Sequence, residues 1–249
     1  MRIRMALGTM LAAAVLTVMA PAARAAGGDE ARPTERSCGT LRLTGSLPVP
    51  PAGMAVEREV SIGADCTARY GTVRMVPAGK AEGAAARTMA AASGTKKAAS
   101  GATAASGTKA ASGTKADGTH RVSSWNEMYD CCNIRMTGLY TASEWTTGGS
   151  RVAAASTGAT QQFNREPWNA GWSLVSARSD TDCSADCAVS RTEAHADFGY
   201  RGIFDPTGSW YANTHHSYVD LAADGTASCR FDVEARHTFA GWNWRHGCA

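Results

Sequence analysis

The sequence predicts an all-β fold, either an antiparallel β-sandwich or a small barrel, cross-linked by disulfides. Three observations lead to this fold class. Apolar and polar residues alternate over long stretches near the C-terminus, eight cysteines follow an N-terminal leader, and no amphipathic helical pattern follows that leader. A disordered low-complexity linker is expected between a short N-terminal β segment and the main domain.

The leader, residues 1–25, has the three parts of a secretory signal peptide. Arg2 and Arg4 form its positive start, an apolar run follows, and Ala23-Arg24-Ala25 is a small-residue cleavage site. The apolar run is shorter than the roughly 20 residues that a membrane-spanning helix needs. We therefore expect cleavage after Ala25, a secreted extracellular protein, and no transmembrane segment in the mature chain.

The charge distribution argues against nucleic acid as a partner. The full chain has a formal net charge of +3, and removal of the three leader arginines brings it to zero. All five lysines lie in the linker, whereas residues 121–249 carry ten arginines and fourteen acidic residues. The linker is thus either a solubilising spacer or a positive tether with weak attraction to anionic cell-wall polymers.

Composition divides the mature chain into four zones. Residues 26–37 are polar and loose, residues 38–77 form the short β segment, residues 78–120 form the linker, and residues 121–249 form the main domain. The linker repeats AASGTK and has no aromatic residue, so it cannot bury enough apolar surface to fold. The N-terminal β segment is too small for a core of its own, so it either depends on a disulfide or docks on the main domain.

Alternating residues define the expected strands. In the N-terminal segment Leu41 and Leu43 alternate with polar neighbours. In the main domain three alternating segments predict an antiparallel meander, because turns that contain Gly208 and Gly225 separate them. These segments are residues 192–204, 209–221 and 226–239. Earlier strands are expected within residues 133–141, 151–163 and 171–177.

Four disulfides are expected, because an even number of cysteines in an exported chain usually pairs completely. The cysteines are Cys38, Cys66, Cys131, Cys132, Cys183, Cys187, Cys229 and Cys248. A Cys38–Cys66 bond would cross-link the N-terminal segment. The adjacent Cys131 and Cys132 are expected to bond to separate partners, since a ring between neighbours is strained. Pairing with the last two cysteines would tie the first strand of the main domain to its last two segments, but the sequence leaves the connectivity open. The sequence has no CxxC pair, which argues against a zinc site.

The outward face of the meander is predicted to gather carboxylates and imidazoles. If Leu221 pairs with Thr226, His215 lies opposite Asp232 on this face and His216 lies in the core. The residues expected to share the face and to bind a ligand are Glu193, His195, Asp197, His215, Asp232 and Glu234. Such a face could bind a partner, supply metal ligands or an acid–base pair, or carry only ion pairs in solvent. An open sheet face lacks the concavity that catalysis needs.

Two further motifs each admit a functional and a structural interpretation. Trp242 and Trp244 would form a glycan-stacking platform if they were exposed, or part of the core if they were buried. The Asp180-x-Asp182-x-Ser184-x-Asp186 run is similar to the start of a calcium loop, but Ala185 stands where the EF-hand loop has glycine. The alternative is an acidic surface turn closed by a Cys183–Cys187 disulfide.

The sequence contains no GxSxG, HExxH, Walker A or GxGxxG motif. The leading hypothesis is a non-enzymatic binding protein of the extracellular space or cell envelope, without a cofactor. Its expected partner is a cell-envelope polymer such as a glycan, or an extracellular protein. The alternatives are a secreted hydrolase that uses Glu193, His195, Asp232 or Glu234, and a self-associating surface protein. The Ala- and Arg-rich composition and the leader resemble exported proteins of high-GC Gram-positive bacteria.

Overall fold

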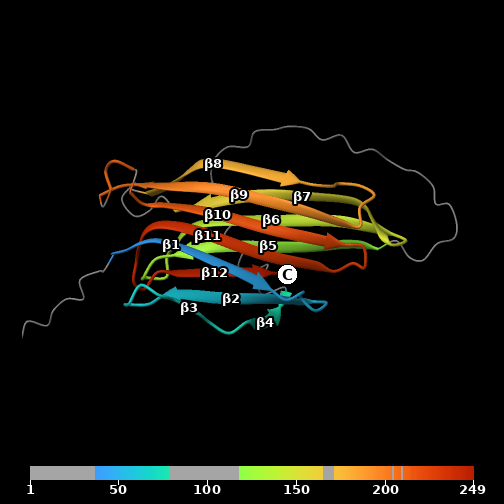
Figure 1. The fold of residues 1–249 in the computed structure, drawn as a ribbon, viewed down its shortest axis with the longest axis horizontal. Coiled ribbons are helices and arrows are strands. Elements are labelled where there is room, and N and C mark those ends of the chain that lie inside the picture. The colour runs from blue at the N-terminus through green and yellow to red at the C-terminus, as the bar shows by residue number, and fades with distance from the viewer. Residues whose placement is uncertain (1–36, 79–117, 165–170, 204, 209) are drawn as a thin grey trace, which may run out of the picture. The chain divides into compact units, whose positions relative to one another are not determined.

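The computed structural model describes residues 37–78, 118–164, 171–203, 205–208 and 210–249, and it confirms the all-β fold class. These residues form twelve strands in two antiparallel sheets, which face each other as the layers of a sandwich (Figure 1). The predicted leader, almost all of the loose segment and most of the predicted linker lie outside the described residues. Within the described part, no helix has the length and apolar character needed to cross a membrane.

The five-stranded sheet has the strand order β1-β11-β10-β9-β8. Its strands are β1 (Ser37–Leu47), β8 (Gly171–Thr181), β9 (Val189–Arg201), β10 (Ala212–Ala222) and β11 (Ala227–Phe239). Because β10 pairs antiparallel with both β9 and β11, the predicted meander is confirmed. β8 forms one edge of this sheet, and residues 173–180 of it are exposed.

The seven-stranded sheet has the order β3-β2-β12-β5-β6-β7, and β4 also pairs with β2. Its strands are β2 (Met54–Ile62), β3 (Ala68–Tyr70), β4 (Arg74–Pro77), β5 (Thr119–Tyr129), β6 (Arg135–Gly148), β7 (Arg151–Phe163) and β12 (Asn243–Cys248). The strands expected from residue 133 onward correspond to β6, β7 and β8, and β7 has the predicted bounds.

The N-terminal β segment docks on the main domain and contributes to both sheets. β1 pairs with β11 in one sheet, whereas β2 pairs with β12 in the other (Figure 1). The two alternatives that the sequence leaves open are both present, because the segment docks on the main domain and also has the Cys38–Cys66 disulfide. The segment has no core of its own, because Leu43, Val56 and Val60 belong to the one large apolar cluster between the sheets.

The space between the sheets combines large apolar side chains with a few buried polar ones. Leu43, Phe198, Phe231 and Trp244 are at most 1% exposed and supply much of the apolar volume. Alternation along each strand brings them inward from both sheets. Burial of these inward faces is the main favourable contribution to folding.

Asn126 of β5 joins the two sheets through hydrogen bonds. Its Nδ2 donates to the backbone carbonyls of His216 at 3.0 Å and Asp232 at 3.3 Å, both in the other sheet. Its Oδ1 accepts from Nε1 of Trp244 at 2.6 Å. A buried amide that is bonded at both ends fixes β10 and β11 relative to β5.

A second, smaller apolar cluster covers the outer face of the seven-stranded sheet. It contains Ala55, Trp125 and Tyr140. Trp125 lies directly across from Gly247 in the β5–β12 register, and its indole covers this glycine. A Cβ atom at position 247 would lie 1.8 Å from Cζ2 of Trp125, so only glycine fits beneath the ring.

The structure contains three disulfides rather than the expected four. They are Cys38–Cys66, Cys183–Cys187 and Cys229–Cys248. The first confirms the expected cross-link of the N-terminal segment. The third joins β11 to β12, and therefore joins the two sheets.

The expected partners of Cys131 and Cys132 are wrong, because Cys229 and Cys248 bond to each other. Cys131 and Cys132 lie in the turn between β5 and β6, and their Sγ atoms are 3.6 Å apart. The sequence could not reveal this, since pairing depends on which strands lie opposite each other across the sandwich.

Candidate functional site

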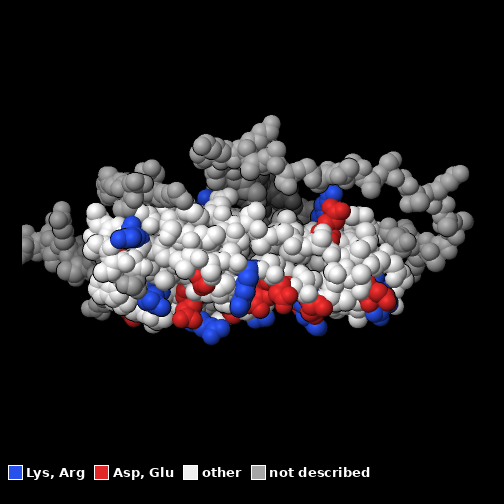
Figure 2. Space-filling model, turned by 90° about the horizontal axis from the view of Figure 1, so that it is seen from above, with Lys and Arg blue, Asp and Glu red and all other residues white. Residues whose placement is uncertain are grey.

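The outer face of the five-stranded sheet carries the polar cluster that the sequence predicts. We call it the polar face and define it by Arg42, Ser176, Arg178, Glu193, His195, Asp197, Thr214, His216, Tyr218, Arg230, Asp232 and Glu234. The strand register places these residues in rows across the sheet. Acidic and basic side chains of the described residues gather along one side of the molecule in Figure 2.

The register of the meander corrects one member of the predicted cluster. Leu221 pairs with Ala227 rather than with Thr226, so His216 and not His215 lies opposite Asp232. A slip of one residue exchanges the two faces of a strand. His216 therefore lies on the polar face, whereas His215 lies in the core.

His215 is fully buried between the sheets, where its Nε2 lies 2.9 Å from Oγ1 of Thr137. Burial disfavours the charged imidazolium and lowers the pKa of His215 to about 3, against a smaller opposing contribution from Asn126. A buried neutral ring of this kind is part of the core and cannot contact an external ligand.

Two imidazoles meet at the centre of the polar face. His195 and His216 are direct cross-strand neighbours, with ring centroids 4.6 Å apart and Nδ1 atoms 3.5 Å apart. Nε2 of His195 lies 2.9 Å from Oδ2 of Asp197, and Nδ1 of His216 lies 2.8 Å from Oε1 of Glu193. Each imidazole is thus oriented by its own carboxylate.

Asp197 is held by three side chains from three strands. Ser176 and Thr214 donate hydrogen bonds to it at 2.5 and 2.8 Å, in addition to the contact with His195. Partial burial alone would raise the pKa of Asp197, but the hydrogen bonds from these side chains outweigh it and lower the pKa to about 2. The carboxylate is therefore ionised throughout the physiological pH range.

The order of contacts matters for chemistry. In a nucleophilic Ser-His-Asp arrangement the serine hydroxyl bonds to the imidazole, which accepts its proton. Here Ser176 donates to Oδ2 of Asp197 instead, and Nε2 of His195 contacts the same oxygen, so the serine hydroxyl is bonded to the carboxylate and not to the imidazole. This geometry orients the histidine but does not activate the serine.

The far side of the polar face contains an aromatic ring and further charges. The guanidinium of Arg230 lies 3.7 Å above the ring of Tyr218, and Arg42 forms an ion pair with Asp232 at 3.6 Å. Glu234 lies opposite Thr214 on one neighbouring strand and opposite Arg42 on the other.

The predicted Glu193, His195, Asp197, Asp232 and Glu234 all lie on this face. Sequence reasoning missed Ser176, Thr214, His216 and Tyr218.

The predicted tryptophans are not on the surface. Trp242 is 7% exposed and Trp244 is fully buried, which agrees with the core-packing interpretation. Trp210 is 53% exposed and its ring lies 4.7 Å from that of His237. A stacking platform built from the Trp242-Asn243-Trp244 segment would need exposed indoles that this fold does not provide.

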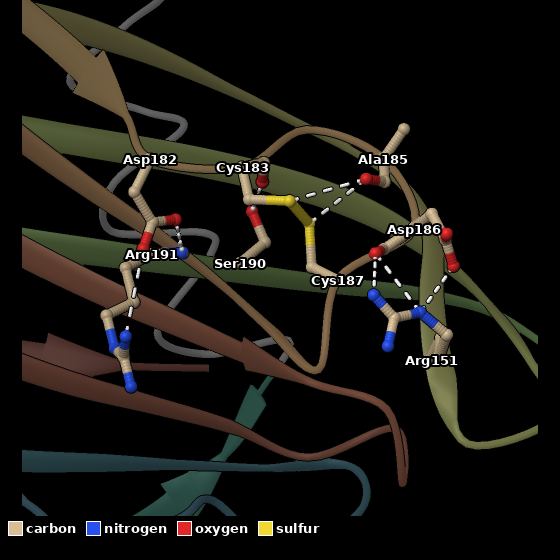
Figure 3. The surroundings of a disulfide bond; sticks show 8 residues. All are labelled: Arg151, Asp182, Cys183, Ala185, Asp186, Cys187, Ser190 and Arg191. Atoms are coloured by element: carbon tan, nitrogen blue, oxygen red, sulfur yellow. Dashed lines mark hydrogen bonds and ion pairs between the residues drawn. A yellow bond between two sulfur atoms is a disulfide. The ribbon is translucent and has the colours of Figure 1, made fainter.

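The acidic run is a surface turn closed by the local Cys183–Cys187 disulfide, as the structural interpretation expects (Figure 3). Two of its three carboxylates are directed at arginines. Asp182 accepts a hydrogen bond from the backbone N–H of Arg191 at 2.8 Å and forms an ion pair with its guanidinium at 3.7 Å, and Asp186 pairs with Arg151 (Figure 3). Asp182 and Asp186 are therefore engaged in ion pairs of the surface turn.

A second polar group lies on the outer face of the seven-stranded sheet. Tyr129 and Tyr140 both donate to the carboxylate of Glu127, which also pairs with Arg135 at 3.4 Å. Burial, followed by the charge of Glu127, raises the pKa of both tyrosines. The two hydroxyls are thus fixed as hydrogen-bond donors to Glu127.

An open cavity of about 780 Å³ lies at one end of the sandwich. It is lined by the loop between β1 and β2, including Pro51, and by Arg121, Trp145 and Ala249. Arg121 and Glu144 form an ion pair at 2.8 Å there. None of the residues that define the polar face line this cavity.

We compared the chain with models of protein families, with curated proteins and with solved structures, and none of them matches it.

Proposed function

We propose that this chain is a secreted, non-enzymatic binding protein that recognises a charged extracellular partner, either a cell-envelope polymer or a protein, through the polar face. The observation that carries the proposal is the mutual fixation of the polar groups. The side chains of Glu193, Asp197 and Arg42 are 40%, 35% and 66% exposed, yet each has a defined hydrogen-bond or ion-pair partner. Groups that are already ordered lose little entropy when a partner binds.

The polar face suits recognition better than hydrolysis. It is the open face of a sheet, and a catalytic site needs a concave surface that removes water from the reacting atoms. Ser176 donates to the carboxylate of Asp197, whose pKa of about 2 makes it a poor base for activating a serine hydroxyl. For these reasons the hydrolase alternative has less support than binding.

The charges of the face favour a charged partner over a neutral glycan. Sugar recognition usually needs exposed aromatic rings, and Trp242 and Trp244 are buried. The face instead combines carboxylates with Arg42 and Arg230. Opposite charges on a partner would align with these side chains and would set its orientation.

A retention assay with residues 26–249 tests this proposal. The protein is passed over cell walls and peptidoglycan, and over chitin and cellulose as neutral polymers, at low and at high salt. We expect the double variant R230Q/D232N to lose about tenfold in retention on charged walls at low salt. It removes the exposed charge of Arg230 and the buried carboxylate of Asp232 that holds Arg42 in place, and each lost pair removes on the order of 0.5–1 kcal/mol. Retention of the wild type should also fall at high salt.

The matched control is Glu144→Gln, an exposed carboxylate that pairs with Arg121 in the other sheet. Its retention should equal that of the wild type. Equal retention of R230Q/D232N and wild type, on walls and on an immobilised extracellular protein fraction, would count against the polar face as the binding surface.

A further inference from the structure

Three atoms on the polar face share a single proton, which one of them donates and the other two compete to accept. Nε2 of His195 faces the carboxylate of Asp197, so in the neutral ring that nitrogen carries the hydrogen and Nδ1 has a lone pair. Nδ1 of His216 faces Oε1 of Glu193 at 2.8 Å, so it carries the hydrogen of that ring. This one N–H also faces Nδ1 of His195 at 3.5 Å, and it cannot satisfy both acceptors well.

We infer that a divalent transition metal binds here in place of that proton, with Nδ1 of His195, Nδ1 of His216 and the carboxylate of Glu193 as ligands. Zinc–nitrogen bonds are about 2.0–2.1 Å long, and two of them at a tetrahedral angle separate the nitrogens by about 3.4 Å. The observed separation is 3.5 Å. The two imidazoles thus already have the spacing of a metal-bound pair.

The third ligand needs a small rearrangement. Among the described residues, no group of three or more ligand side chains is already closed around a metal position. Glu193 has a side chain that is 40% exposed, so it can rotate from the proton of His216 toward the metal. Water completes the coordination sphere from the solvent side, as in other sites with three protein ligands.

The surroundings of His195 have the form of a metal site's outer shell. A histidine that binds a metal usually donates its other ring N–H to a carboxylate, which is itself hydrogen-bonded. Asp197 accepts from His195 in this way, and Ser176 and Thr214 hold Asp197. Asp197 is therefore a positioning residue that acts through His195.

The donor set selects the class of metal. Two imidazoles and one carboxylate suit zinc, copper(II) and nickel(II), whereas calcium and magnesium prefer oxygen ligands alone.

The two imidazoles have one charged neighbour each on the adjoining strands. Arg178 of β8 lies opposite His195, and Asp232 of β11 lies opposite His216. When the metal binds, the hydrogen on Nδ1 of His216 moves to Nε2 of the same ring, so the neutral imidazole offers its lone pair and no net proton is released. This inference goes beyond the proposed binding function, because it depends only on the two imidazoles and their carboxylates.

The test is a calorimetric titration of residues 26–249 with zinc. We use the background C131S/C132S to exclude thiol ligands. We expect one equivalent of zinc to bind, and calcium not to bind. H195A and H216A are each expected to remove saturable zinc binding, and D197N should weaken it roughly tenfold to a hundredfold.

The matched control is His120→Ala, a partly buried histidine that lies outside the polar face and contacts Thr147. It should bind zinc as the background does. No saturable zinc binding, or zinc binding that persists in the H195A/H216A double variant, would overturn the inference. The two proposals can fail separately. Cell-wall retention of R230Q/D232N, measured in a chelator so that no metal is bound, tests the partner, and the zinc titration of H195A tests the metal. Thermal unfolding of each variant without metal verifies that it is folded.

Discussion

Acidification from pH 7 to pH 4 is expected to remove several kcal/mol from the free energy of unfolding. His215 and His246 are both fully buried, and burial lowers the pKa of each from 6.5 to about 3. Arg58 adds to the effect at His246. Neither ring nitrogen of His246 has a hydrogen-bond partner among the described residues, so nothing there stabilises the protonated ring.

The direction of the effect follows from proton binding. Between pH 6.5 and about 3 the unfolded chain holds protons on both histidines, whereas the folded protein does not. Folding stability therefore rises with pH across this window and is lost as the pH falls. Each histidine contributes about 1.4 kcal/mol per pH unit, which amounts to about 3 kcal/mol per histidine at pH 4.

Denaturant unfolding at pH 7, 6, 5 and 4 measures this dependence. His215→Gln and His246→Gln should each reduce the slope of the unfolding free energy against pH by about half, because one of two titrating groups is removed. This slope can be compared between variants even where a variant is less stable than the wild type at pH 7. Gly158→Ala, which removes no titrating group, is the control with an unchanged slope. Asp197 and Asp205, whose pKa values are about 2, affect stability only below their ordinary pKa of 3.8. A wild-type stability that is flat from pH 6 to pH 4 would refute the account.

Gly247→Ala is expected to destabilise the protein by about 3 kcal/mol, because the new methyl group overlaps the indole of Trp125. The clash is with the ring itself, since the added carbon would lie 1.8 Å from Cζ2. To avoid it, Trp125 must leave the cluster that it forms with Ala55 and Tyr140. The lost packing of Trp125 in this cluster adds to the cost of the overlap itself.

Gly158→Ala is the matched control for this substitution. Gly158 also lies in a strand, β7, and a Cβ atom there would meet nothing within 4 Å. We expect its stability to change by less than about 0.5 kcal/mol, as is usual for surface positions. In a Trp125→Ala background Gly247→Ala should cost little, which a double-mutant cycle would show. A full cost in that background would mean that the indole is not the cause.

Alternation was sufficient to predict the strands of the meander but not the register between them. On β11 the inward residues Ala227, Phe231 and Val233 are apolar, so the inward face was identified correctly. On β10 the inward residues include Asn213, His215 and Ser217, which look like a solvated face. The polarity of the two faces of β10 is nearly equal, so the sequence could not distinguish His215 from His216.

The composition of the candidate site was therefore predictable in part. Glu193, His195 and Asp197 alternate along one strand whose inward face is clearly apolar, and the structure places them on the polar face. Ser176 could not be predicted, because β8 contains a register irregularity between Leu174 and Ser176 that only the folded sheet shows. A single irregularity of this kind changes which residues face outward.

The division of the N-terminal strands between two sheets has a consequence for how the protein is made. β1 needs β11, and β2 needs β12, so a contact such as that between Thr238 and Gly39 spans 199 residues. Neither sheet can close on the ribosome before β11 and β12 have been synthesised, and contacts of such long range form slowly. The two sheets are thus expected to close late, after the last strand has been made. Oxidation of Cys229 and Cys248 would then link the finished sheets to each other.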